Sequence, residues 1–310
     1  MQIYGLIGYP VKHSLSPLMH NAAFKKIGMP AEYRLFELKP EELEDFLLKD
    51  ISVKDTAGNS FSSQDIIGFN ITIPHKVKAR EILEKKFPFP FASLILPEVY
   101  YIRSSGAVNT VKRSAGKLEY RNTDAIGFLE SLKEDLKFNT EDKNILLIGC
   151  GGGGRAVIAA LSSTPAKTKK IYISDINDAA INSTENYFSQ SDFIEFPQIR
   201  AKLEFIPNID IPKAIGNCDL LVNATPCGMK ESDPCVVDEK LIRRNLAVFD
   251  LIYNPKETKL LKIAREKGAA AVNGLGMLLY QGVHAFEFWT GEKAPVKEMR
   301  EALNQGVKNL

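Results

Sequence analysis

Stretches in which the hydrophobic residues have the spacing of a strand alternate with stretches in which they have the spacing of a helix. This order predicts an α/β protein. In the first third, strand-like apolar runs occur at 2–8, 31–38 and 65–74. Helical patterns at 16–28, 40–50 and 76–87 separate and follow these runs. Strands that alternate with helices predict parallel βαβ units. In the first helix we expect Ser16 to be the N-cap, Pro17 to hold the first helical position and Gly28 to end the helix.

The next segments are less regular. The polar stretch SVKDTAGNSFSSQD (52–65) predicts an exposed loop. The prolines of 87–101 exclude a long helix and predict irregular chain with short helical pieces. A hairpin with strands near 106–112 and 117–122 follows, and then a helix over 124–135.

A second α/β unit begins at Asn144 with a buried strand, a glycine turn, a helix and a further strand. Later strand patterns occur at 203–206, 219–225, 246–253 and 269–274, with helices between them, and the rest of the chain is helical. We therefore predict two domains. Residues 1–122 with 276–310 form a split α/β substrate domain, and residues 123–275 form an inserted, doubly wound Rossmann-type domain with a parallel sheet.

The glycine turn ILLIGCGGGGRA is typical of a dinucleotide-binding site, because it follows a buried strand and opens a helix. Gly149 permits the tight turn, Gly151 lets the backbone approach a pyrophosphate, and Gly154 allows helix and strand to pack closely. Gly152 and Gly153 complete the run at the helix N-terminus, where unpaired N–H groups favour an anion. The alternative is a flexible loop without a ligand, but four successive glycines are entropically costly.

Asp175 ends the next strand, 26 residues after Gly149. A carboxylate at this position accepts hydrogen bonds from the adenosine ribose and repels a 2′-phosphate, so the residues favour NAD over NADP. The alternative role for Asp175 is to cap the following helix, which Asn177 or Asp178 could do instead.

Composition narrows the class of protein. Of 310 residues, 45% are hydrophobic and 25% are charged, and the net charge of +2 does not indicate nucleic-acid binding. The four cysteines lack metal-ligand spacing, which predicts free buried thiols in a reducing compartment and no metal site. Neither a signal peptide nor a membrane span is indicated, so we expect a cytoplasmic protein, either a monomer or a homodimer.

Eight short motifs occur in order along almost the whole chain: HSLSP (13–17), NITIPHK (70–76), GAVNT (106–110), NTD (122–124), GCGGGGRA (149–156), NATPCGM (223–229), DLIYNP (250–255) and GLGMLLYQGVHAFEFWTG (274–291). In this order the chain closely resembles the shikimate dehydrogenase family, which includes shikimate/quinate dehydrogenases. The resemblance implies NAD(P)-dependent, reversible reduction of 3-dehydroshikimate to shikimate in aromatic amino acid biosynthesis.

The resemblance also implies the roles of individual residues. Lys76 and Asp124 are the catalytic pair, which we interpret as a coupled unit that orients the hydroxyl and moves its proton. Ser14 and Ser16 bind the substrate carboxylate. The expected contacts of the ring hydroxyls are Asn70, Thr72, Asn109 and Gln281, with Tyr253 near the substrate. The dinucleotide site is completed by Asn223, Ala224, Thr225, Gly274 and Met277, where Gly274 and Gly276 let the chain turn and Met277 packs by the nicotinamide.

One departure from the family concerns the nucleotide. Many members carry Asn-Arg-Thr after the second Rossmann strand, with an arginine for the NADP phosphate, whereas here the residues are Ser174, Asp175 and Ile176. The alternative function is an NAD-dependent quinate/shikimate dehydrogenase of a degradative pathway. A nucleotide-binding sensor without activity is a third hypothesis, and the presence of both Lys76 and Asp124 argues against it.

Overall fold

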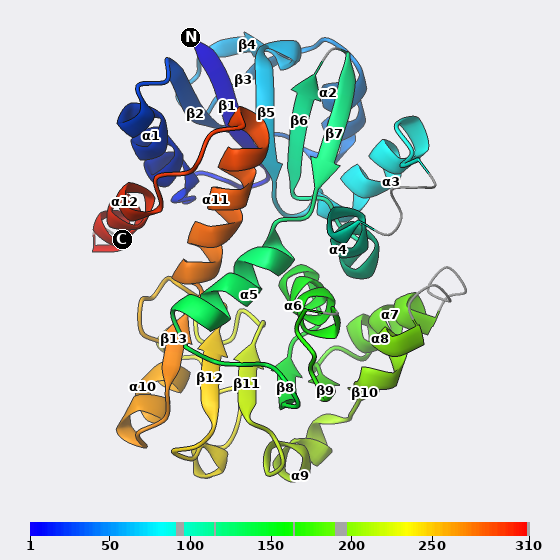
Figure 1. Cartoon of the computed structure of the whole chain (residues 1–310), viewed down its shortest axis with the longest axis vertical. Helices are drawn as coiled ribbons and strands as arrows, with labels where there is room; N and C mark the ends of the chain where they lie inside the picture. Colours follow the sequence, from blue (N-terminus) through cyan, green and yellow to red (C-terminus); the bar gives the residue numbers. More distant parts are fainter. Residues whose placement is uncertain (91–95, 115, 164, 190–196, 309–310) are drawn as a thin grey trace. The chain divides into compact units, whose positions relative to one another are not determined.

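The computed structural model describes residues 1–90, 96–114, 116–163, 165–189 and 197–308. The chain divides into two compact units, one made of Met1–Gly127 with Leu278–Leu310 and the other of Phe128–Met277. Figure 1 shows the elements of each unit. The fold is the predicted one, a split α/β unit and an inserted unit built on a parallel sheet.

The first unit contains a mixed five-stranded sheet in the order β2-β1-β5-β6-β7. Its strands are β1 (Gln2–Gly8), β2 (Ala31–Glu37), β5 (Ile66–Ile71), β6 (Thr110–Ser114) and β7 (Lys117–Arg121). The first three strands pair in parallel, and β6 and β7 are antiparallel to their neighbours. The core on one side of the sheet includes the fully buried Phe36, Phe46 and Phe69.

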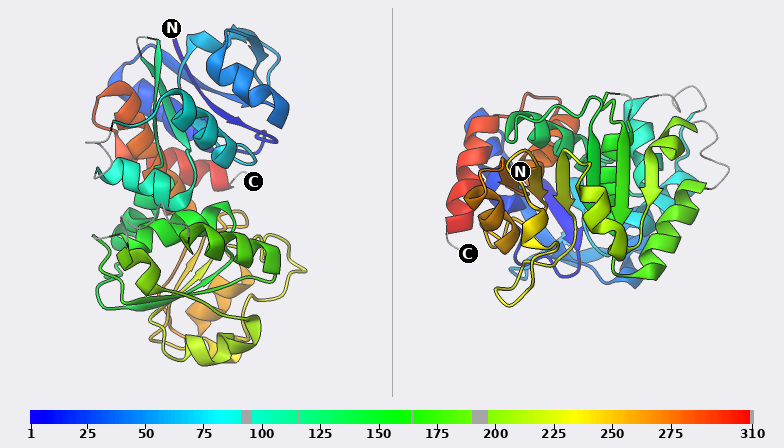
Figure 2. Two further views of the ribbon diagram at one scale, coloured as in Figure 1. Left: turned by 90° about the vertical axis from the view of Figure 1, so that its right-hand side faces the viewer. Right: turned by 90° about the horizontal axis from the view of Figure 1, so that it is seen from below.

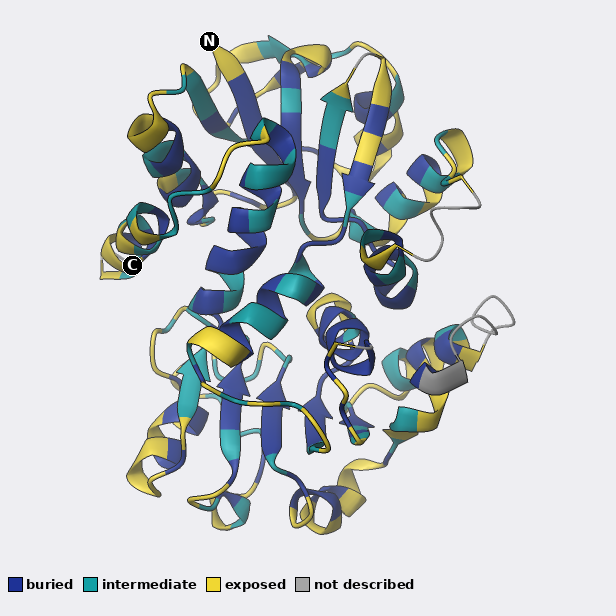
Figure 3. Cartoon of the chain, viewed as in Figure 1, coloured by how far each residue is buried: buried dark blue, intermediate teal, exposed yellow. Residues whose placement is uncertain are grey.

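Helices and short segments complete this unit. They are α1 (Ser16–Ile27), η1 (Pro40–Glu42), α2 (Leu43–Leu48), β3 (Ser52–Lys54), β4 (Ser60–Ser62), η2 (Ser63–Asp65), α3 (Lys76–Lys86), α4 (Pro97–Ser105) and α12 (Val296–Lys308). Helices α5 (Asp124–Glu134) and α11 (Leu275–Thr290) each begin in one unit and end in the other, because the division falls after Gly127 and before Leu278. Strands β1 and β5 are almost entirely buried, most helices carry exposed residues, and α11 carries none, as Figure 3 shows.

The second unit has a six-stranded parallel sheet in the order β10-β9-β8-β11-β12-β13. In chain order this is 3-2-1-4-5-6, the strand order of a Rossmann fold. The strands are β8 (Asn144–Ile148), β9 (Lys170–Ser174), β10 (Leu203–Phe205), β11 (Leu220–Asn223), β12 (Ala247–Asp250) and β13 (Ala271–Asn273). Helices lie on both faces of the sheet (Figure 2): α6 (Gly152–Ser162), α7 (Asp178–Ser189), α8 (Pro197–Lys202), α9 (Ile211–Ile215) and α10 (Lys259–Glu266), with short helical turns η5 (Asn208–Asp210) and η6 (Glu239–Leu241).

Three local predictions were wrong. Ser16 is not the N-cap of α1 but its first residue, and the hydroxyl of Ser14 accepts the Ser16 N–H at 3.2 Å. Segment 52–65 is not a loop: β3 and β4 form a hairpin, because buried Asp55 accepts hydrogen bonds from Ala57 and Asn59 across the turn. The strand expected from 106 begins at Thr110.

The cysteine prediction is right in part. Cys150 and Cys218 are free and buried, whereas Cys227 and Cys235 are free and half-buried. In the irregular segment, helix α4 begins at Pro97, and residues 91–95 lie outside the described part of the chain. Within the described residues, no helix combines the length and apolar character that a membrane crossing requires.

Candidate active site

Lys76 and Asp124 form an ion pair in the first unit. Each is the first residue of its helix, α3 or α5, and the Nζ atom lies 2.6 Å from Oδ2. The side chains are 22% and 13% exposed, so both remain accessible to a ligand. The other carboxylate oxygen of Asp124 accepts a hydrogen bond from the Asn109 amide at 2.8 Å. Two donors therefore fix the carboxylate, and the N-terminus of α5 favours its negative charge.

The backbone around this pair is also fixed. The carbonyl of Lys76 accepts the Val108 N–H at 3.0 Å. The side-chain oxygen of Asn122 accepts the N–H groups of Asp124 and Ala125, so Asn122 caps α5. Its amide nitrogen donates to the Ser105 hydroxyl and the Ala107 carbonyl. The motif NTD contains this residue, but the sequence pattern drew attention only to its aspartate.

Two of the predicted substrate contacts, Asn70 and Asn109, are buried and largely engaged inside the protein. The side-chain amide of Asn70 donates to the main-chain carbonyl of Asn109 at 3.2 Å and to the Thr110 hydroxyl at 3.0 Å. The Asn109 amide donates to Thr123 as well as to Asp124, and its oxygen accepts the Thr123 N–H at 2.7 Å. In this structure both side chains therefore organise the site. The Asn109 side-chain oxygen is fully engaged, because it accepts the Thr123 N–H and the Thr110 hydroxyl. The Asn70 side-chain oxygen accepts the Tyr33 hydroxyl and keeps one lone pair for a ligand.

The remaining predicted contacts in the first unit come from three segments. The hydroxyl of Ser14 donates to that of Ser16 at 3.2 Å, where the loop after β1 enters α1. Thr72 follows β5 and donates its N–H to the Ile7 carbonyl at 2.9 Å. Gln281 is buried on α11, and its amide donates to the Leu278 carbonyl at 2.9 Å.

Gly127 explains how α5 approaches Gln281. A Cβ atom at Gly127 would lie 2.6 Å from the Gln281 nitrogen, so the close packing of the two helices requires glycine. Tyr253, the other predicted substrate contact, belongs to the second unit. Its pKa is raised by burial.

In the second unit, only some positions of the glycine turn require glycine. Gly149 has φ +95°, and a Cβ atom at Gly154 would lie 2.1 Å from the Gly149 oxygen. A Cβ atom at Gly153 would lie 3.0 Å from the Leu251 side chain. Gly151 and Gly152 are exposed, and a Cβ atom there would meet no atom within 4 Å. The open space before the N-terminus of α6 fits the pyrophosphate of a dinucleotide.

Asp175 lies against this turn. One carboxylate oxygen accepts the Cys150 N–H at 2.9 Å, and the other accepts the Asn177 N–H at 2.9 Å. Helix α7 is capped by Asn177, whose oxygen accepts the N–H groups of Ala179 and Ala180. Asp175 therefore does not cap α7, and its carboxylate is placed beside the glycine turn.

The loop after β11 is held by a buried carboxylate that the sequence reasoning missed. Asp250 accepts hydrogen bonds from the Asn223 amide at 3.0 Å, the Thr258 hydroxyl at 2.6 Å and the Ile252 N–H at 3.1 Å. Burial raises the pKa of Asp250 to about 6, although these donors oppose the rise. The oxygen of Asn223 in turn accepts the N–H and hydroxyl of Thr225.

The other predicted dinucleotide residues surround this loop. Ala224 contacts the glycine turn, because a Cβ atom at Gly149 would lie 2.8 Å from the Ala224 carbonyl carbon. At Gly274 a Cβ atom would lie 2.0 Å from the Leu251 oxygen, so glycine is required there. Met277, on the first turn of α11, is half-buried. Among the described residues, no group of three or more His, Cys, Asp or Glu side chains is arranged to hold a metal.

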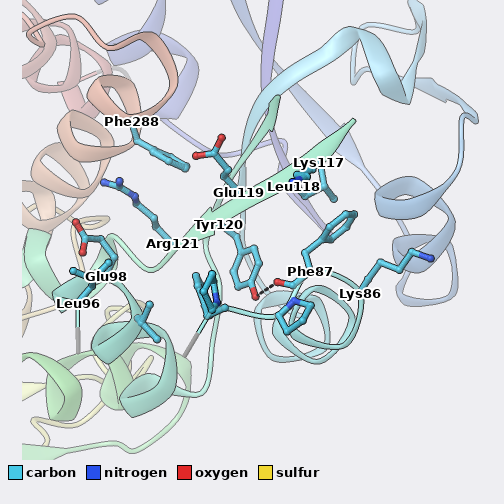
Figure 4. A pocket seen from close by; sticks show the side chains of 14 residues that line it. Lys86, Phe87, Leu96, Glu98, Lys117, Leu118, Glu119, Tyr120, Arg121 and Phe288 are labelled. Atoms are coloured by element: carbon cyan, nitrogen blue, oxygen red, sulfur yellow. Dashed lines mark hydrogen bonds between the residues drawn. The ribbon is translucent and has the colours of Figure 1, made fainter. Parts of the chain in front are cut away.

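A cavity of about 640 Å³ opens elsewhere in the first unit (Figure 4). Its lining includes Phe87, Phe89, Tyr120, Arg121 and Phe288. The Tyr120 hydroxyl donates to the Phe87 carbonyl at 2.8 Å, and the Arg121 guanidinium lies 4.2 Å from the Phe288 ring centroid. None of the predicted site residues lines this cavity, so it is distinct from the candidate active site.

Comparison with known proteins decides the family. Residues 6–87 match the model of the shikimate dehydrogenase substrate binding domain, and residues 274–303 match that of the shikimate 5'-dehydrogenase C-terminal domain. A relative from Methanopyrus kandleri, named shikimate dehydrogenase (NADP(+)), is 39% identical, and the alignment covers 99% of this chain and 96% of the relative. The chain belongs to the shikimate dehydrogenase family.

Solved structures agree with this family. A shikimate dehydrogenase crystallised with NADP+ has a TM-score of 0.79 and 33% identity, covering 99% of this chain and 96% of that one. A quinate dehydrogenase from Corynebacterium glutamicum, in complex with NAD, has a TM-score of 0.77 and 26% identity, covering 98% and 99%. Both nucleotides thus occur among structures similar to this chain, and the NAD preference based on Asp175 stays a prediction.

Proposed function

We propose that this chain catalyses the reversible, NAD(P)-dependent interconversion of 3-dehydroshikimate and shikimate. The observation that best supports this proposal is the partly exposed ion pair of Lys76 and Asp124, with 2.6 Å between Nζ and Oδ2, in a chain of this family. We assign residues 1–122 with 276–310 to substrate binding and residues 123–275 to dinucleotide binding. The free thiols agree with a reducing compartment, and we propose a cytoplasmic location.

Reduction of a ring ketone adds a hydride to carbon and a proton to oxygen. Gly151, Gly152 and the N-terminus of α6 would hold the pyrophosphate of NAD(P)H, which would supply the hydride. Lys76 donates a hydrogen bond to the carbonyl oxygen and transfers the proton as negative charge develops there. In the reverse direction the neutral amine receives that proton from the hydroxyl.

Asp124 holds the ammonium group in place through the 2.6 Å ion pair, so the two residues act as one proton-transfer unit. Asn109 fixes the orientation of this carboxylate from the side opposite to Lys76. Ser14 and Ser16 bind the substrate carboxylate, while Thr72 and Gln281 contact the ring hydroxyls. Each of these polar groups would lose a partner with a substrate lacking the matching oxygen, at a cost of about 1–3 kcal/mol.

The second candidate is an NAD-dependent quinate/shikimate dehydrogenase. Asp175 favours it, because its carboxylate beside the glycine turn would repel the 2′-phosphate of NADP. Quinate carries an additional ring hydroxyl, which requires an additional polar partner in the substrate site.

A two-by-two kinetic comparison tests both candidates. Initial rates of nucleotide reduction are measured with shikimate or quinate and with NAD or NADP. We expect the largest kcat/KM with shikimate, and NAD ahead of NADP. A higher kcat/KM for quinate would favour the second candidate, and no turnover in all four combinations would contradict both.

A further inference from the structure

Tyr33 on β2 is held by α1 at three points. Its side chain is 2% exposed, and the His20 ring stacks on it with 4.4 Å between ring centroids and an angle of 13°. The Asn21 side chain pairs with the Tyr33 main chain in both directions, at 2.7 Å and 3.1 Å. The Ser16 side chain also lies close enough to the Tyr33 hydroxyl to lower its pKa, against the larger rise that burial causes. The position of α1 therefore determines the position of the Tyr33 side chain.

The Tyr33 hydroxyl links the position of α1 to β5. It donates to the Asn70 carbonyl oxygen at 2.8 Å. Burial raises the pKa of Tyr33 well above its ordinary value, so the hydroxyl stays protonated and remains a donor. Within the described residues, Tyr33 is the side chain whose hydrogen bond orients the Asn70 oxygen, since the Asn70 nitrogen bonds Asn109 and Thr110.

We propose that Tyr33 is a positioning residue that sets the spacing between Ser16 and Asn70, and thereby between the carboxylate-binding and the hydroxyl-binding parts of the substrate site. The inference rests on the proposed function, in which a rigid ring acid must contact both parts at once. A small change in this spacing weakens both contacts together. In the part of the chain that the structure describes, side-chain hydrogen bonds connect Tyr33 to Lys76 and Asp124 only through Asn70 and Asn109. The bonds of Asn109 to Thr123 and Asp124 do not involve the Tyr33 hydroxyl, so the proton-transfer pair keeps its geometry when that hydroxyl is lost.

The variant Tyr33→Phe tests this role, because it removes the hydroxyl and keeps the ring that stacks on His20. We expect KM for shikimate to rise about 5- to 20-fold, the effect of losing a buried hydrogen bond. We expect kcat to change less than about threefold and KM for the nucleotide to be unchanged, since the lost contacts stabilise ground state and transition state alike. Quinate replaces shikimate in this comparison if it is the better substrate.

Tyr4→Phe is the matched control. Tyr4 is also 2% exposed, lies on the neighbouring strand β1 and, like Tyr33, packs against Trp289. Its hydroxyl donates to the Gln2 side chain at 3.3 Å, at a different position from the Tyr33 hydroxyl, which bonds Asn70. Tyr4→Phe should leave KM for shikimate unchanged at a similar melting temperature.

A second variant, Asn21→Ala, removes the pairing between α1 and the Tyr33 main chain while leaving the hydroxyl in place. We expect a smaller rise in KM for shikimate, about two- to fivefold, with kcat unchanged. This variant decides the question if Tyr33→Phe does not fold.

The two hypotheses fail in different ways. Absence of wild-type turnover with either acid contradicts the proposed function. With wild-type turnover present, the positioning role is overturned if KM in Tyr33→Phe matches that in Tyr4→Phe. A fall in kcat of the same size in Tyr33→Phe and Tyr4→Phe, with KM unchanged in both, would also overturn it.

Discussion

The two units build their sites in different ways. In the first unit, side chains from β2, from β5 and from the segments around the starts of β6 and α5 form a continuous set of hydrogen bonds that ends at Lys76 and Asp124. In the second unit, one turn between β8 and α6 presents backbone N–H groups around open space. The first site therefore depends on the identity of many side chains, and the second on the absence of side chains at particular positions.

This difference predicts how each site responds to change. A substitution in the first unit removes a specific hydrogen bond and leaves a buried partner unsatisfied. A substitution in the glycine turn acts through steric conflict, and its effect depends on the space at that position.

Lys76→Met should lower kcat about 10²- to 10⁴-fold, because it removes the group that exchanges the proton of the substrate oxygen. Lys78→Met is the control, since Lys78 lies on the same helix and forms an exposed ion pair with Glu81 at 3.1 Å. Steady-state kinetics with shikimate and both nucleotides measure the effect. Near-normal kcat in Lys76→Met would contradict the assigned role.

Gly154→Ala should destabilise the second unit by about 1–3 kcal/mol, because the new methyl group would lie 2.1 Å from the Gly149 oxygen. Gly152→Ala should leave stability almost unchanged, since the position is open, but should raise KM for the nucleotide. Denaturant unfolding and nucleotide titration of both variants check this pair. Equal stability of the two would contradict the steric argument.

The two units should respond to acid in opposite directions. Burial lowers the pKa of His20 to about 3 in the first unit, so the unfolded chain binds more protons and stability falls as pH drops below 6.5, by about 2 kcal/mol at pH 5. The pKa of Asp250 is raised to about 6, so the folded second unit binds more protons and gains about 1 kcal/mol between pH 6 and 5.

Hydrogen exchange at pH 7 and pH 5, corrected for intrinsic rates, resolves these effects by unit. His20→Phe should reduce the acid sensitivity of the first unit while keeping a ring against Tyr33. Asp250→Asn should abolish the acid gain of the second unit. If acid loosened both units equally in wild type and variants, the assignment to these two groups would be wrong.

Asp175→Ala should give the smallest effect, a fall of about tenfold in kcat/KM with NAD and little change with NADP, because ribose contacts and phosphate repulsion are both lost. Asp178→Ala is the control, since that carboxylate is exposed on the first turn of α7. An unchanged NAD-to-NADP ratio in Asp175→Ala would count against the ribose role.

The same contrast explains what the sequence predicts well. The glycine turn and the six parallel strands follow from patterns within short stretches, so their positions are readable one stretch at a time. Lys76 and Asp124 are 48 positions apart, and their pairing was expected only through the family resemblance. Hairpin β3–β4 was missed because its stability comes from Asp55, a buried carboxylate in a stretch that looks uniformly polar.

Residues that position other side chains through hydrogen bonds were the hardest to predict from the sequence. Tyr33 lies in a strand where nothing distinguishes it from a core aromatic, and its role depends on Ser16 and Asn70, which lie 17 and 37 positions away along the chain. Asp250 resembles a strand-end aspartate on a protein surface, yet it is fully buried beneath the loop that contains Asn223. Such roles arise from packing between distant segments, which a single sequence does not encode locally.

Lys76 and Asp124 work as one unit in the proposed reaction, and a double-mutant cycle measures the coupling between them. The kcat values of Lys76→Met, Asp124→Asn and the double variant are compared with wild type. We predict that the double variant is no slower than the slower single variant, because either change disables the same proton-transfer unit. Losses that multiply in the double variant would show two independent contributions and would contradict the account.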